Sequence, residues 1–233
     1  MDRFRALIVT ALLAGSAAGL ILFAIQHVTI VPLIERAEVF EDAAPSHAMA
    51  DHADAAWEPA AGSQRIGLTA VSTMLSGIGF ASVLLAAMSL RAAPLTPSRG
   101  VLWGLAGFAC FVLAPALGLP PKPPGAAVGA LEARQLWWLG TVVATAAGLW
   151  MLGGISASWP VRALGVVVIL IPHAIGAPGP DGEDVVPAAL MREFAWLSVL
   201  TNLVFWLVLG ALCGWLGERT PRGRGIAPAA PTA

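Results

Sequence analysis

The stretch QHVTIVPLIERAEVFED, Gln26–Asp42, carries the chain from an apolar run into a cluster of carboxylates. At about 100° per residue, a helix would place His27, Glu35 and Glu38 within one quadrant. A rise of ~1.5 Å per residue separates His27 from Glu38 by roughly 16 Å, so one ion cannot contact both on an unbroken helix. Pro32 removes a backbone hydrogen bond and predicts a kink between them. The pattern indicates a ladder of acidic and imidazole groups, although a helix end with solvated carboxylates explains it too.

The composition on either side of this stretch is that of a membrane protein. Of the 233 residues, 58% are hydrophobic and 12% are charged, whereas soluble domains carry about 25% charged residues. Six apolar segments reach the length of a membrane-spanning helix, roughly 17 to 25 residues. They cover about 6–34, 66–90, 100–119, 136–155, 160–177 and 194–217. We therefore predict an all-α, polytopic membrane protein with six transmembrane helices, or five if the proline-interrupted segment 163–180 is re-entrant.

The spans predict a single transmembrane domain, residues 1–218, followed by a disordered cytoplasmic tail, residues 219–233. With both termini in the cytoplasm, eight Lys and Arg residues lie inside and five outside, as the positive-inside rule favours. The same threading places twelve of the fourteen acidic residues outside. An outward face of this kind attracts cations.

The predicted outside loop, residues 35–65, contains candidate metal ligands in a short tract. His47, Asp51 and His52 lie close together within it. Imidazole and carboxylate groups together suit divalent first-row metals such as cobalt, nickel or zinc. The alternative is an acidic, disordered loop that happens to include two histidines.

His173 directly follows Pro172 near the outer end of the predicted fifth span. An ionisable residue at membrane depth is a functional hypothesis by default, and the proline frees a carbonyl in the same helix. If the first and fifth spans are neighbours, His27 and His173 could face one metal-binding cavity that Glu35 completes. The alternative is a histidine that is hydrogen-bonded at the membrane interface.

Enzyme signatures are missing from the sequence. It contains no HExxH, GxSxG, Walker loop or CxxC pattern. We expect no enzyme activity, no permanently bound cofactor and no nucleic-acid partner.

Several stretches resemble the CbtA-type cobalt transporter subunits of bacteria. They are PLIERAEVFE (32–41), LGLPPKPPG (117–125), RQLWW (134–138), TAAGLW (145–150), PHAIGAP (172–178) and FWLVLG (205–210). The resemblance implies a multi-pass protein of the bacterial inner membrane that takes part in cobalt uptake and is linked to cobalamin metabolism. It also implies a small single-span partner subunit that bears a histidine motif.

The sequence therefore predicts the membrane subunit of a cobalt uptake transporter, with divalent cobalt as substrate and the lipid bilayer as surroundings. We expect the acidic, histidine-containing outer face to collect the metal and the helix bundle to pass it on. The candidate metal ligands are His27, Glu35, Glu38, His47, Asp51, His52 and His173. Two alternatives remain open: a six-helix, cobalamin-related vitamin-binding component, and a non-transporting assembly subunit.

Overall fold

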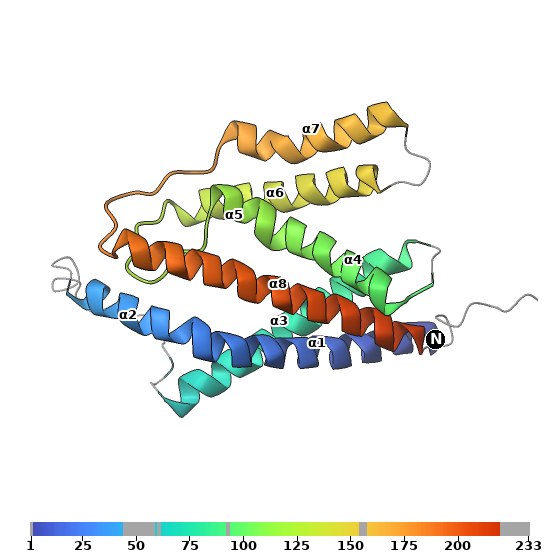
Figure 1. Cartoon of the computed structure of the whole chain (residues 1–233), viewed down its shortest axis with the longest axis horizontal. Helices are drawn as coiled ribbons and strands as arrows, with labels where there is room; N and C mark the ends of the chain where they lie inside the picture. The colour runs from blue at the N-terminus through green and yellow to red at the C-terminus, as the bar shows by residue number, and fades with distance from the viewer. Residues whose placement is uncertain (1, 44–58, 60–61, 92–93, 154–157, 220–233) are drawn as a thin grey trace, which may run out of the picture. The chain divides into compact units, whose positions relative to one another are not determined.

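The computed structural model describes residues 2–43, 59, 62–91, 94–153 and 158–219. All regular structure in these ranges is helical, which confirms the predicted all-α class (Figure 1). The elements are α1 (Asp2–Thr29), α2 (Val31–Asp42), α3 (Ser63–Ser89), α4 (Pro97–Phe108), a π-helical segment (Ala109–Leu113), α5 (Ala114–Gly118), α6 (Leu131–Leu152), α7 (Trp159–Ile175) and α8 (Ala188–Glu218).

Five helical stretches in the described residues are long and apolar enough to cross a membrane. They are Phe4–Thr29, Ser63–Ser89, Pro97–Gly118, Leu131–Leu152 and Ala188–Glu218. The predicted fifth span corresponds to α7, an apolar helix of 17 residues. At ~1.5 Å per residue it is about 25 Å long, at the short end of the spanning range. The helices therefore confirm a polytopic membrane protein.

The chain forms two compact units whose residues alternate along the sequence. The first comprises Met1–Ala24, Glu58–Leu105 and Leu203–Ala233, and the second comprises Ile25–Trp57 and Ala106–Asn202.

Glycines set the helix packing of the first unit. A Cβ atom on Gly15 of α1 would overlap the backbone of α3 at Gly77. The same holds between α4 and α8, where Gly100 and Gly210 each approach the other's backbone. Small residues allow helices in membranes to approach closely, so that dispersion contacts and not hydrophobic burial hold them together.

The second unit is held partly by an apolar cluster between α2 and the residues around the start of α8. Its buried members are Ile30, Leu33, Ala37, Val186, Leu190 and Phe194. A second contact joins α6 to α7, which lie side by side (Figure 1). There Gly148 lies against Gly165 and Ile169. These two contacts fix the faces that α2 and α7 present.

The proline-rich turn after α5 is tied to the segment before α8, also within the second unit. The Lys122 ammonium donates to the Ala127 carbonyl at 2.6 Å and lies 3.3 Å from the Asp184 carboxylate. The Ala127 N–H donates to that carboxylate at 2.8 Å. Gly125 has a φ of 73°, a conformation that favours glycine, and a Cβ there would lie 3.0 Å from Glu41. The turn is therefore a rigid corner.

The glycine packing predicts a specific loss of stability. Replacing Gly210→Ile should lower the unfolding free energy by about 1–3 kcal/mol, because the new side chain overpacks the contact with α4. Unfolding of the purified full chain in a titration with SDS measures this. Gly79→Ile is the matched control, since a Cβ at Gly79 meets no atom within 4 Å. Equal unfolding midpoints for the two variants would contradict the packing account.

Candidate functional site

The helix is interrupted at Ile30, between the end of α1 and the start of α2. This position is two residues before Pro32, the residue from which a kink was predicted. The Ile30 N–H still donates to the Gln26 carbonyl at 2.8 Å, and the N–H groups of Leu33 and Ile34 both donate to the Ile30 carbonyl at 3.0 Å. Pro32 stands in the first turn of α2, where its missing N–H costs little. His27 is exposed in the last turn of α1, where a helix dipole favours positive charge.

Helix α2 presents its carboxylates on the side away from the apolar cluster. Leu33 and Ala37 are buried, whereas Glu35 and Asp42 are exposed and Glu38 is half-buried. The spacings of three and four residues place these acids in one row along the helix. This row is the acidic part of the predicted series of acidic and imidazole groups.

Two features of the charges near this row bear on the field around it. The Arg36 guanidinium lies 3.6 Å from the Glu193 carboxylate of α8, so its charge is directed to another helix. The last turn of α2 contains no basic residue, although Asp42 stands there and a helix C-terminus disfavours negative charge. A bound cation would offset that unfavourable field.

His173 is held by backbone carbonyls on both sides of its ring. Its Nε2 lies 3.0 Å from the Ala114 carbonyl oxygen and its Nδ1 lies 3.2 Å from that of Ile169. The Trp137 ring packs edge-on against it at 5.9 Å between centroids, and the Trp137 indole N–H donates to the Pro172 carbonyl at 3.1 Å. Carbonyl oxygens only accept, so neutral His173 donates to one of them and the protonated ring donates to both.

This geometry leaves His173 poorly placed for metal. A metal-bound imidazole uses one nitrogen for the ion and commonly donates its other N–H to a carbonyl or carboxylate. Here a carbonyl oxygen already stands where the ion would bind. These carbonyl contacts are hydrogen bonds of the kind that the alternative for His173 requires.

The predicted ligands do not converge in the described part of the chain. Within it, no three His, Cys, Asp or Glu side chains lie close enough to hold one metal ion. His27, Glu35 and His173 therefore do not form the shared site that neighbouring first and fifth spans could have built. His47, Asp51 and His52 lie outside the described residues.

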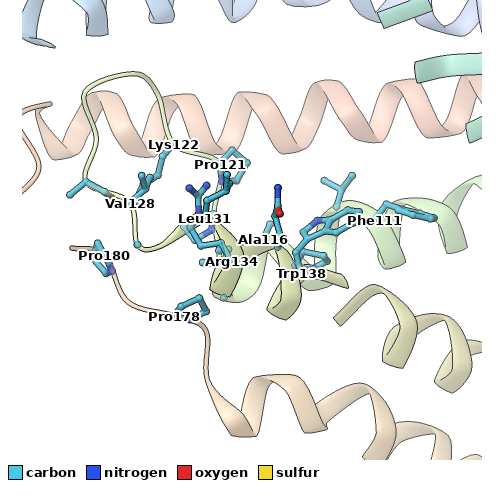
Figure 2. Close-up of a pocket in the computed structure, with 18 of the residues that line it drawn as sticks. Phe111, Ala116, Pro121, Lys122, Val128, Leu131, Arg134, Trp138, Pro178 and Pro180 are labelled. Carbon is cyan, nitrogen blue, oxygen red and sulfur yellow. Dashed lines mark hydrogen bonds between the residues drawn. The ribbon is translucent and has the colours of Figure 1, made fainter. Parts of the chain in front are cut away.

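A pocket of about 610 Å³ in the second unit was not predicted as a site from the sequence. Figure 2 shows Phe111 and Trp138 toward one end of it, Lys122 and Val128 toward the other, and Arg134 between them. Its walls come from the motifs LGLPPKPPG and RQLWW and from Pro178, Pro180 and Asn202. The sequence shows these motifs as separate stretches, and their spacing does not show that they enclose a space.

The carbonyl contacts of His173 predict a structural effect. His173→Leu should lower the unfolding free energy by about 1–2 kcal/mol in chelator-treated buffer, because the contact of the ring with the Ala114 carbonyl, 59 residues away in the chain, is lost. His173→Gln, which keeps a side-chain N–H donor, is the matched control and should lose less stability than His173→Leu. SDS unfolding of the full chain measures both. A chelator that destabilises the parent but not His173→Leu would point instead to a metal at His173.

Comparison with known proteins finds a matching family. No curated protein and no solved structure matches the chain. The family described as "Probable cobalt transporter subunit (CbtA)" matches residues 4–218, which include every described helix span that could cross a membrane. The chain therefore belongs to the CbtA family of cobalt transporter subunits.

Proposed function

We propose that this chain is the membrane subunit of a cobalt uptake transporter that collects divalent metal on the acidic face of α2 and on the adjoining loop. The observation that carries the proposal is the row of carboxylates at Glu35, Glu38 and Asp42, held on one side of α2 by burial of the other. Family membership supplies the transported element, and carboxylate oxygens suit a divalent first-row ion.

The row favours collection of metal over tight storage. Its carboxylates follow one another along a helix and do not surround a point, so each contributes one or two oxygens to an ion that keeps much of its water. Weak binding at several positions raises the local concentration of cations without trapping them. His47, Asp51 and His52 extend this surface in the proposal, and His27 stands at its membrane end.

Passage through the bundle requires a further component in this proposal. We infer a small, single-span partner subunit that supplies histidine ligands in trans. Cobalt uptake measured in cells that carry the chain with and without that partner distinguishes a transporter subunit from a cobalamin-related binding component, which would retain an organic ligand and not the bare ion.

Removing the carboxylate row should change the concentration dependence of uptake. The double variant Glu35→Gln with Glu38→Gln should raise the cobalt concentration for half-maximal uptake about three- to tenfold, because two attractive charges are lost. The maximal rate should change little, since the row collects metal and does not conduct it. Uptake of radiolabelled cobalt at limiting and saturating metal measures both quantities.

A second pair of variants tests the loop in the same assay. His47→Ala with His52→Ala should also raise the half-maximal concentration. Glu218→Gln, at the other end of the chain, controls for charge and should leave uptake at the parental level. If limiting-metal uptake is unchanged in both double variants, α2 and its loop do not collect the ion.

We further propose that the chain lies in the bacterial inner membrane with both termini in the cytoplasm. The basis is the excess of Lys and Arg on the side of the termini when six spans are threaded. Reporter fusions after Ala233 and within residues 43–60 should therefore report opposite sides of the membrane. A reporter after Ala233 that is active in the periplasm would leave an odd number of spans and would exclude α7 as a crossing helix.

A further inference from the structure

The pocket of the second unit is unsuited to the metal path, because its charged lining is basic. Among the residues that line it, only Lys122 and Arg134 carry charge. The Asp184 carboxylate offsets Lys122 at 3.3 Å, which leaves the charge of Arg134 uncompensated. A bare divalent cation is repelled from such a space, whereas an anion is attracted.

Arg134 is placed to receive that anion. Its side chain is half-buried, and among the described residues its guanidinium has no hydrogen-bond or ion-pair partner. A guanidinium offers five N–H donors in a fixed fork that matches phosphate or carboxylate oxygens. Glu132 lies in the same turn of α6 but is not among the residues that line the pocket.

The rest of the pocket is apolar and aromatic. Phe111 and Trp138 pack with their ring centroids 6.2 Å apart at one end (Figure 2). Val128 and Leu131 line the wall toward the proline-rich turn. A volume of about 610 Å³ falls within the range of small-molecule sites, about 300–1,000 Å³. An occupant that combines an oxyanion with an apolar chain matches both halves of this space.

We propose that this pocket binds a phosphate-bearing anionic amphiphile, with its phosphate on Arg134 and its apolar chain along Phe111 and Trp138. An anionic phospholipid has this chemistry and surrounds any chain that spans a bilayer. Free phosphate shares the oxyanion but has no apolar part to place against the aromatic rings. The bound amphiphile would brace the corner that Lys122 and Asp184 close.

Native mass spectrometry of the full chain in a neutral detergent tests the proposal without cobalt. Titration with phosphatidylglycerol should give one retained lipid per chain, bound about tenfold more tightly by the parent than by Arg134→Gln, as expected for loss of a charge-assisted contact. Arg192→Gln is the matched control, because Arg192 is exposed and does not line the pocket. Equal affinity of the parent and Arg134→Gln would overturn the proposal.

Two further measurements distinguish a phospholipid from free phosphate as the anion that the pocket binds. Phosphatidylcholine, which has no net charge, should bind more weakly than phosphatidylglycerol, and equal retention would overturn the charge argument. Inorganic phosphate at millimolar concentration should leave the lipid in place. Displacement of the lipid by inorganic phosphate would assign the pocket to a free anion and overturn the role of the aromatic end.

A fluorescence measurement keeps the proposal testable if Arg134→Gln fails to fold. Phosphatidylglycerol with brominated acyl chains should quench part of the tryptophan emission of the otherwise unaltered chain. That part should disappear in Trp138→Phe, which keeps an aromatic ring beside Phe111. Identical quenching with and without Trp138 would show that the lipid chain does not enter the pocket.

Discussion

The apolar contact between α2 and the start of α8 is the interaction on which the proposed metal-collecting surface depends. A helix of 12 residues is marginal alone in water, where about 12–15 residues are the lower limit. Ile30, Leu33 and Ala37 gain their burial from Val186, Leu190 and Phe194, and this packing rather than helix propensity maintains α2. Because one face of α2 is buried in that contact, Glu35 lies on the opposite, exposed face.

A second set of contacts within the same unit joins side-chain ring N–H groups to backbone carbonyls of neighbouring helices. His173 and Trp137 supply ring N–H groups to carbonyls of the π-helix–α5 region and of α7. Gly118 has to be small, because a Cβ there would overlap the Trp137 ring. These contacts bring α5, α6 and α7 together beside the proline-rich corner, and the pocket is the space they leave. The unit thus separates an acidic surface on α2 from a basic pocket at α6.

The sequence predicted the helices well because a membrane imposes a strong, local signal. Long stretches without charge mark the spans, and Pro32 marked the break that the chain makes at Ile30. The hydrogen-bond partners of His173 were not predictable in the same way, because Ala114 lies 59 residues away in the chain. The spacing of histidines does not reveal which carbonyl groups will accept their hydrogen bonds. The pocket was missed for the same reason, because only the fold brings Arg134 and the proline-rich turn to the same space. The histidines of the loop, His47 and His52, remain a prediction.

The proposed collection of metal requires that the carboxylate row of α2 binds the ion directly. Equilibrium dialysis of radiolabelled cobalt against the purified full chain measures that binding apart from transport. We expect weak binding that is reduced when Glu35 and Glu38 are both replaced by Gln, with the helical circular dichroism of the chain unchanged. Cobalt binding of equal affinity and stoichiometry in the parent and the double variant would contradict this expectation.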